Sequence, residues 1–275
     1  MLADVLRYLC CPHCSAGLMS EPGSLRCSSG HGFDVARQGY VNLLAGKASV
    51  TGDNAAMVAA RDEFLSAGHY KPIMAATVAA SAGEGCVLDL GAGTGHYLAA
   101  VLDASPDRVG IALEIAKPAL RRAARAHPRL GAVGADTWRT LPVRDGAISV
   151  ALNVFAPRNA AEIARVLAVD GRLVVVSPTA AHLGELVSAL GLLTVGEDKA
   201  ARVSASLPGF VESTQDICEF VMSLTHEEVL TLVGMGPSAW HVDAATLRAK
   251  VVTLPAPVRV TASVTVTSYV KSVKS

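Results

Sequence analysis

The sequence predicts an α/β protein with a doubly wound, mainly parallel sheet, preceded by a small cysteine-rich segment. Three observations point to this fold. Strand-length apolar runs alternate with helical patterns from residue 86 onward, a glycine-rich turn follows the first of these runs, and four cysteines fall within the first 27 residues. Strand–helix alternation builds parallel sheets with right-handed crossovers. With 275 residues and 51% hydrophobic composition, the chain can bury a sizeable core.

The charge balance and the hydropathy pattern limit which binding partners and which cell compartment we expect. Lys+Arg and Asp+Glu are both 24, so the formal net charge is zero and a nucleic-acid partner would need a local basic patch. We find no membrane-length apolar run and no signal peptide at the start of the chain. The six cysteines therefore indicate reduced thiols and not a disulfide framework. We expect a cytoplasmic protein without a membrane partner.

The expected elements follow the hydrophobic periodicity. A helical pattern covers residues 55–82, with a break at Gly68 and Pro72. Near-continuous apolar runs, typical of buried parallel strands, occupy 86–91, 108–115, 131–136, 147–155 and 171–178. Helical patterns at 96–104, 117–127 and 159–167 separate them. Two later strands are expected at 217–225 and 258–270. The second alternates Val with Thr or Ser, which predicts an antiparallel strand at a sheet edge.

A glycine loop, "VLDLGAGTGHY", follows the strand at 86–91, in the order strand, acid, Gly-x-Gly-x-Gly, helix. Gly91 and Gly93 allow a sharp turn close to a ligand, and Gly95 allows the next helix to pack near the strand. The spacing is one residue shorter than the dinucleotide fingerprint, which binds a pyrophosphate. The loop instead resembles that of class I (Rossmann-like) methyltransferases, which use S-adenosylmethionine.

Polar residues also end the next three strands. Glu114 can accept hydrogen bonds from both ribose hydroxyls, Asp136 would lie beside the adenine, and Asn153 ends the strand at 147–155. Such folds present the methyl group to the substrate at the last of these positions. Each residue alone is equally well explained as a helix cap. The ordered set, at the carboxyl ends of successive strands, favours a cofactor site.

The cysteine-rich segment has the spacing of a tetrahedral zinc site. Cys11 and Cys14 form one close pair, and Cys27 and His31 form a second after twelve intervening residues. Four protein ligands leave no open position, so the zinc is expected to be structural. The alternative is a redox C-x-x-C motif, which would normally adjoin a βαβ unit. Cys10 is expected to be a bystander.

Together the two halves resemble the RlmA family of 23S rRNA (guanine-N1)-methyltransferases. The similarity runs through the metal pairs, "FDVARQGYVNLL", "AARDEFLSAGHYKPI" and the glycine loop. The wording of "ALNVFAPRN" and "GMGPSAWH" is closest to the tylosin-resistance (TlrB-type) branch of Gram-positive actinomycetes. That branch modifies a guanine in hairpin 35, and the Gram-negative branch modifies a neighbouring guanine.

The resemblance also implies residues and partners. It makes Cys11, Cys14, Cys27 and His31 the zinc ligands, and it adds four residues to the cofactor contacts: Tyr70, Thr94, Gly95 and His182. Without the resemblance, Tyr70 and His182 would pass for a packing residue and a helix-terminal residue. The implied partners are hairpin 35 of 23S rRNA and a second copy of the chain in a homodimer.

RNA binding needs local positive charge. Arg121, Arg122 and Arg125 lie on the helical pattern at 117–127 with no acid between them. A run of this kind is usually a solvated helix face, but its position just after Glu114 makes phosphate contacts an expectation. Guanine N1 lies on the base-pairing edge, so the target base must leave its stack. Phe155, Trp240 and Tyr70 are aromatic candidates to receive it.

The predicted organisation has three parts. Residues 1–45 form a zinc-binding RNA-recognition module, 46–54 a linker, and 55–275 the methyltransferase domain. No residue is assigned as the base that assists loss of the N1 proton. Two alternatives stay open: a methyltransferase acting on another RNA or a small molecule, and a zinc-bearing RNA-binding protein with an inactive cofactor site.

Overall fold

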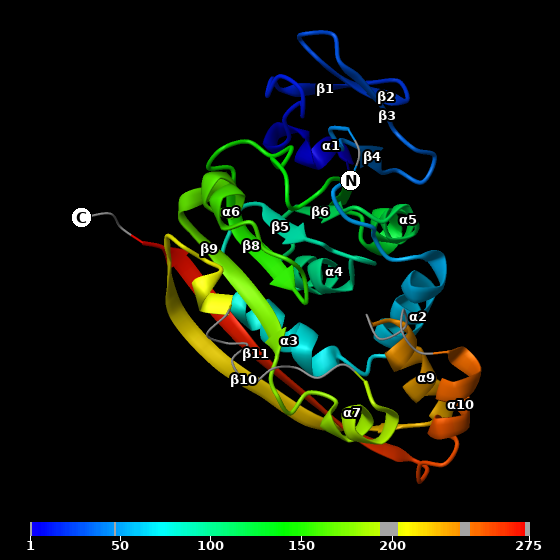
Figure 1. The fold of residues 1–275 in the computed structure, drawn as a ribbon. Coiled ribbons are helices and arrows are strands. Elements are labelled where there is room, and N and C mark those ends of the chain that lie inside the picture. Colours follow the sequence, from blue (N-terminus) through cyan, green and yellow to red (C-terminus); the bar gives the residue numbers. More distant parts are fainter. Residues whose placement is uncertain (1, 47, 193–202, 237–242, 273–275) are drawn as a thin grey trace.

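An eight-stranded sheet organises the chain (Figure 1). The computed structural model describes residues 2–46, 48–192, 203–236 and 243–272. The strand order is β10-β11-β9-β8-β5-β6-β7-β4, and all neighbours from β9 to β4 are parallel. The strands are β4 (Val41–Asn42), β5 (Val87–Leu90), β6 (Gly110–Glu114), β7 (Leu130–Gly134), β8 (Ile148–Val154), β9 (Leu167–Pro178), β10 (Phe210–Leu224) and β11 (Val258–Lys271). The predicted doubly wound sheet is confirmed.

Helices cover both faces of this sheet, as the continuous apolar runs require. Consecutive strand residues enter different cores: Leu88 and Ile111 pack with α6 on one side, and Val87 and Ala112 pack with α3 and α4 on the other. The helices of eight or more residues are α2 (Ala55–Ser66), α3 (Lys71–Ala80), α4 (His96–Asp103), α5 (Lys117–Ala126), α9 (His226–Gly234) and α10 (Ala244–Val251). Shorter helices in the described part of the chain include α1 (Leu2–Val5), α6 (Ala160–Val166) and α7 (Gly184–Leu190).

The helical pattern at 55–82 divides where the sequence predicts. The Asn54 side chain caps α2 by accepting a hydrogen bond from the amide of Met57 at 3.0 Å. Gly68 adopts φ +87° between α2 and α3, a conformation that favours glycine. Pro72 lies in the first turn of α3, where its missing N–H removes no helical hydrogen bond.

The prediction of an edge strand at 258–270 is wrong. β11 is antiparallel, as predicted, but it lies between β9 and β10, and β10 forms the edge. Ser263, Thr267 and Ser268 of this strand are buried, and its hydroxyls bond to the chain of the β9 side: half-buried Thr265 meets the Ser177 hydroxyl at 3.0 Å, and Thr179 donates to the Ser263 hydroxyl at 2.7 Å. The alternation of Val with Thr and Ser therefore reflects satisfied hydroxyls inside the sheet, and not exposure to water.

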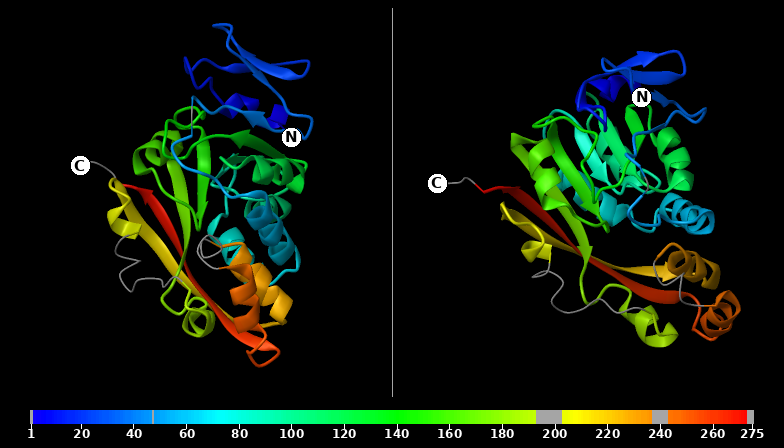
Figure 2. Two further views of the ribbon diagram at one scale, coloured as in Figure 1. Left: turned by 45° about the vertical axis from the view of Figure 1, so that its right-hand side comes forward. Right: turned by 45° about the horizontal axis from the view of Figure 1, so that its top comes forward.

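The cysteine-rich segment forms a second, smaller sheet above the end of the large one (Figure 2). Its strands are β1 (Leu18–Glu21), β2 (Ser24–Cys27) and β3 (Gly32–Asp34). Leu9 and Leu25 belong to the same buried cluster as Leu88 in the large sheet. After β3 the chain adds β4 to β7 as the eighth strand of the large sheet. None of the described helices is long and apolar enough to span a membrane.

Candidate active site and metal centre

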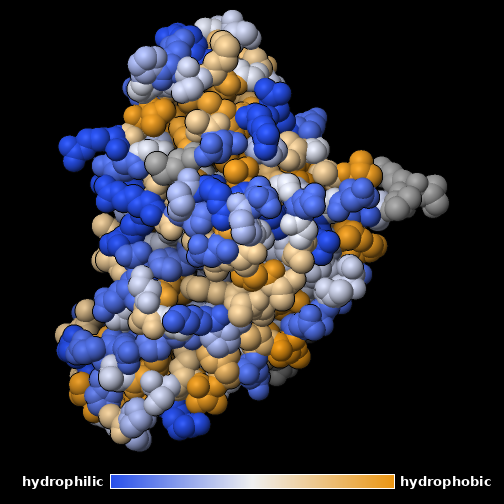
Figure 3. Space-filling view, turned by 180° about the vertical axis from the view of Figure 1, so that it is seen from behind, coloured by the Kyte–Doolittle hydropathy of each residue, from blue (hydrophilic) through white to orange (hydrophobic). Residues whose placement is uncertain are grey.

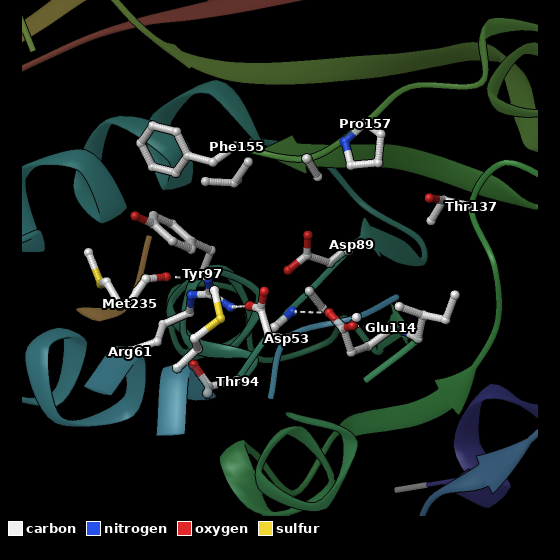
Figure 4. A pocket seen from close by; sticks show the side chains of 18 of the residues that line it. Asp53, Arg61, Asp89, Thr94, Tyr97, Glu114, Thr137, Phe155, Pro157 and Met235 are labelled. Carbon is white, nitrogen blue, oxygen red and sulfur yellow. Dashed lines mark hydrogen bonds and ion pairs between the residues drawn. The ribbon is translucent and has the colours of Figure 1, made fainter. Parts of the chain in front are cut away.

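A cavity of about 480 Å³ opens at the carboxyl ends of β5, β6, β7 and β8 (Figure 4). This is the edge at which ligands bind in open α/β sheets. Six of the predicted cofactor residues line it: Tyr70, Gly91, Gly93, Thr94, Glu114 and Asp136. Gly95, Asn153 and His182 lie behind the lining.

The glycine loop turns in a way that requires glycine. Gly91, Gly93 and Gly95 adopt φ values of +72°, +55° and +84°. A Cβ on Gly91 would lie 3.0 Å from the Cβ of Ala156. A Cβ on Gly95 would lie 3.1 Å from the Cβ of Ala126, so Gly95 permits close packing against α5, whereas the sequence suggested the strand.

Glu114 holds this loop against the next strand. Its carboxylate accepts a hydrogen bond from the amide of Gly93 at 2.8 Å, and further bonds from the amides of Ile115 at 2.7 Å and Ala116 at 2.8 Å. The side chain is buried yet reaches the cavity wall. These bonds fix the orientation of the carboxylate, and its remaining lone pairs can accept ribose hydroxyls.

Asp89 is a cavity residue that the sequence analysis left without a role. It lies at the end of β5, is 2% exposed and points into the cavity (Figure 4). Burial, with a smaller contribution from Glu114, raises the pKa of Asp89 to about 7. A cationic ligand beside it would favour the ionised form. Asp89 is the acid between the strand and the glycines in "VLDLGAGTGHY", and this position was the sequence signal that could have identified it.

Asp136 is bonded by the chain itself. The amide of Ser49 donates to its Oδ2 at 2.8 Å, the Ser49 hydroxyl donates to the same oxygen, and the amide of Trp138 donates to Oδ1 at 3.0 Å. Burial opposes ionisation, but these hydrogen bonds, with Arg139 nearby, hold the pKa of Asp136 below its usual value. Asp136 thus anchors the segment that leads from the small sheet to α2.

That segment, residues 48–54 (the connector), forms a wall of the cavity. Val50, Thr51, Gly52 and Asp53 all contribute to the lining. A Cβ on Gly52 would lie 2.9 Å from side-chain atoms of both Ile115 and Ala116, so the backbone passes directly over the residues after Glu114. The polar composition that predicted a linker carried no signal for this contact.

Tyr70 and His182 form a pair at one end of the cavity. The Tyr70 hydroxyl lies 3.4 Å from Nε2 of His182, and the amide of Ser263 donates to Nδ1 of His182 at 3.1 Å. Because Nδ1 accepts, a neutral imidazole carries its proton on Nε2 and donates toward Tyr70. Burial raises the pKa of Tyr70. His182 therefore orients Tyr70 and lies outside the cavity lining.

Asn153 shapes the loop that follows β8. It is fully buried, and its amide nitrogen donates to the carbonyl of Pro157 at 2.8 Å. Among the described residues its Oδ1 has no hydrogen-bond partner. Phe155 in this loop adopts φ +53° and lines the cavity with 44% of its surface exposed. Phe155, one of the three rings predicted to receive a base, therefore lies at the cavity. Trp240, another of the three, lies outside the described residues.

The basic residues of α5 are all exposed. Figure 3 shows hydrophilic residues along the flank that carries this helix. Arg122 forms an ion pair with Asp62 of α2. Within the described chain, Arg121 and Arg125 make no hydrogen bond or ion pair that would satisfy them internally. The two residues are therefore the more available for a phosphate.

The four predicted metal ligands come together in the small sheet. The ligand atoms of Cys11, Cys14, Cys27 and His31 all lie within 4.8 Å of one another. The Cys14 and Cys27 sulfurs are 3.6 Å apart, and Nδ1 of His31 lies 3.5 Å and 3.3 Å from the sulfurs of Cys11 and Cys27. Zinc–sulfur bonds of about 2.3 Å at tetrahedral angles place sulfurs roughly 3.8 Å apart. The donor set and spacing fit zinc.

Neighbouring residues support this assignment. The Ser29 hydroxyl, with the Ala16 amide, lowers the pKa of the Cys14 thiol to about 6, which favours the thiolate that binds metal. Burial raises the pKa of Cys10, whose amide bonds the carbonyl of Pro142 at 3.1 Å. His13 is exposed and stacks on Phe33 with ring centroids 5.9 Å apart. Neither Cys10 nor His13 belongs to the ligand cluster.

The charges of the cavity decide which ligand it suits. Four carboxylates line it, from Asp53, Asp89, Glu114 and Asp136, against one guanidinium, from Arg61. A pyrophosphate would meet strong repulsion there, whereas a sulfonium or ammonium group would be attracted. The cavity therefore fits S-adenosylmethionine better than a dinucleotide.

Comparisons with known proteins agree with this geometry. The model of the RlmA N-terminal zinc ribbon matches residues 9–48. A 23S rRNA (guanine(748)-N(1))-methyltransferase of Streptomyces fradiae is 50% identical, over 97% of this chain and 98% of its own length. A Micromonospora griseorubida protein assigned as a 23S rRNA (guanine-N(1)-)-methyltransferase is 53% identical, over 98% of this chain and 99% of its own.

A solved structure extends the likeness to the fold. A Haloferax volcanii methyltransferase in complex with the Trm112 activator is 18% identical, with a TM-score of 0.55, over 81% of this chain and 99% of that chain. At this identity the likeness concerns the fold alone. The identity to the two relatives extends over nearly the whole chain. On that ground, the chain belongs to the family of 23S rRNA (guanine-N1)-methyltransferases.

Proposed function

We propose that this protein transfers a methyl group from S-adenosylmethionine to N1 of a guanine in hairpin 35 of 23S rRNA. The observation that carries the proposal is the acid-lined cavity beside the glycine loop, in a chain 50% identical to the Streptomyces fradiae enzyme. We place the target at the guanine that the name of that relative gives, 748, and not at the neighbouring guanine.

The lining residues have distinct tasks in this reaction. When bound, the cofactor supplies an electrophilic methyl group. Glu114 and the glycine loop hold the nucleoside part, and Asp136 keeps the connector closed over it. Asp89 also lines the cavity, and its ionised form balances positive charge on the cofactor. Their combined effect is to fix the methyl donor, since an in-line displacement depends on alignment.

The acceptor base requires a surface at the exposed part of this cavity. Trp138 and Phe155 line the cavity and are 51% and 44% exposed, so each offers a ring face at the mouth. An unstacked base can stack on such a ring while its pairing edge faces the methyl group. Loss of the N1 proton accompanies the attack and needs an acceptor near that edge.

The proposal also gives the small sheet a role. We keep residues 1–45 as the zinc-binding RNA-recognition module, 46–54 as the linker and 55–275 as the methyltransferase domain. Support comes from the compact ligand cluster and from the match of residues 9–48 to a zinc ribbon. Zinc would hold β1–β3 rigid. An rRNA substrate implies a cytoplasmic location, and the resemblance implies a homodimer, which light scattering would test.

Primer extension on treated rRNA tests the function directly. Deproteinised 23S rRNA is incubated with the full chain and S-adenosylmethionine, because an N1 methyl group blocks pairing and stops the copying strand. We expect one cofactor-dependent stop at the base 3′ to guanine 748. Omission of the cofactor and addition of S-adenosylhomocysteine are the controls. A stop at another guanine would move the target, and no stop anywhere would reject rRNA guanine N1 as the acceptor.

A further inference from the structure

Arg61 joins three separate parts of the cavity wall. It extends from α2, its Nη1 bonds Asp53 of the connector, and its Nη2 donates to the carbonyl of Met235 after α9 at 2.7 Å (Figure 4). The glycine loop lies beside it, because a Cβ on Gly93 would be 3.5 Å from Cδ of Arg61. Neither the glycine motif nor the strand-end pattern pointed to this residue.

The charge distribution gives Arg61 a specific task. It is the one arginine or lysine among the described residues that line the cavity, and it shares that lining with four acidic side chains. The ionised carboxylates of the lining would repel a carboxylate carried by a ligand, whereas Arg61 would attract it. A guanidinium can pair with a carboxylate through two parallel N–H donors, which gives both affinity and orientation.

The ion pair between Arg61 and Asp53 is open to exchange. The two side chains are 25% and 28% exposed, so solvent or a ligand reaches the pair. The bond to the carbonyl of Met235 uses the other terminal nitrogen and can persist while the partner of Nη1 changes. A partly exposed pair of this kind is weak enough to be displaced by a better-placed carboxylate.

We propose that Arg61 binds the carboxylate of the amino-acid moiety of the cofactor, and that Asp53 competes with that carboxylate for it. The inference rests on the proposed cofactor and deepens the description of its site. Loading the cavity then frees the Asp53 end of the connector, while Ser49 stays bonded to Asp136 at the other end. The freed end is the one that leads into α2, while the end next to the small sheet keeps its anchor.

Two nucleosides that differ only in the carboxylate test the first half. S-adenosylhomocysteine has the group, and S-adenosyl-3-thiopropylamine lacks it. Calorimetry on the full chain measures both affinities in the wild type, Arg61→Met and Arg61→Lys. We expect Arg61→Met to weaken S-adenosylhomocysteine roughly 10- to 100-fold, and the thiopropylamine by less than about twofold. Arg61→Lys keeps part of the preference. The thiopropylamine serves as the internal control for folding.

The variant Asp53→Asn tests the competition. It removes the rival charge and keeps the size of the side chain, so S-adenosylhomocysteine should bind roughly two- to fivefold more tightly, with the thiopropylamine unchanged. Equal weakening of both nucleosides by Arg61→Met would overturn the carboxylate assignment. Weaker or unchanged binding of S-adenosylhomocysteine to Asp53→Asn would overturn the competition. These results are independent of the primer-extension result, which tests the transfer to guanine, and a wild type that binds neither nucleoside would reject the cofactor itself.

Discussion

The metal cluster is built from one short segment of the chain, whereas the cofactor cavity is built from several segments that lie far apart in the sequence. The four metal ligands fall within residues 11–31, on one hairpin and the turns beside it. The cavity collects its lining from segments spread between Val50 and Met235. Spacing along the sequence therefore specifies the first site almost completely. The second depends on how distant elements pack.

The same contrast predicts how each site fails. Removing one metal ligand leaves three donors that cannot close a tetrahedron, in a segment with little core of its own. Removing one cavity residue leaves the rest of the wall in place, because separate strands and helices hold it. We expect losses at the metal cluster to be structural and losses at the cavity to be confined to binding.

The largest effect is expected from Cys11→Ser compared with Cys10→Ser. The first variant should lose its zinc and several kcal/mol of stability in the small sheet, because metal binding provides much of its folding free energy. The second should keep a full equivalent of zinc. Elemental analysis after gel filtration, with urea unfolding, measures both. Zinc loss from Cys10→Ser and retention by Cys11→Ser would reverse the ligand assignment.

Asp89 should give the protein an unusual pH dependence. Its pKa is about 7 in the folded protein and 3.8 ordinarily, so between these values the folded state holds a proton that the unfolded state releases. The free energy of unfolding should therefore fall as pH rises from about 4 to 7, by a few kcal/mol. Urea unfolding at several pH values should show this slope in the wild type and not in Asp89→Asn. Parallel curves for the two proteins would contradict the buried carboxyl.

Glu114→Gln should reduce cofactor affinity by roughly 10- to 100-fold, because the carboxylate that bonds three backbone amides loses its charge and one acceptor. Calorimetry with S-adenosylhomocysteine measures this. Glu185→Gln is a matched control, since Glu185 also bonds backbone, the amide of Thr261 at 3.0 Å, but lies outside the cavity lining. Equal losses in both variants would point to general destabilisation.

The smallest effect is expected on α5. Replacing Arg121 and Arg125 with Ala should weaken rRNA binding and reduce the salt dependence, by about 0.7–0.9 in the logarithmic slope for each phosphate that the variant no longer neutralises. Arg122→Ala should change less, because Arg122 already pairs with Asp62. Filter binding across a salt series measures the slopes. An unchanged slope in the Arg121 and Arg125 variant would leave this helix as a solvated face.

The sequence predicts those cavity residues that lie next to the ends of strands. The glycine loop, Glu114 and Asp136 were predicted because parallel strands deliver their carboxyl ends to one edge. Arg61, Asp53 and Met235 were missed, since their meeting depends on how α2 packs against α9 and on the path of the connector.

The error at β11 has a related cause. Alternating Val and Thr looks the same for a strand facing water as for one whose hydroxyls are bonded to the next strand. Local pattern cannot tell the two apart, because the partner that satisfies the hydroxyls lies far away in the sequence. The metal ligands could be predicted without knowledge of distant partners, because all four lie within residues 11–31.

The two-residue strand β4 bears on how this protein could be engineered. Val41 and Asn42 pair with Val133 and Gly134, so they cover the carboxyl end of the outer edge of β7, which would otherwise present unpaired backbone groups to other molecules. A fragment beginning at residue 46 would uncover that edge and invite aggregation. The metal-binding segment therefore cannot be exchanged as a separate module by joining two chains within residues 46–54. A chimeric junction should lie upstream of β4, so that the catalytic sheet keeps its own border.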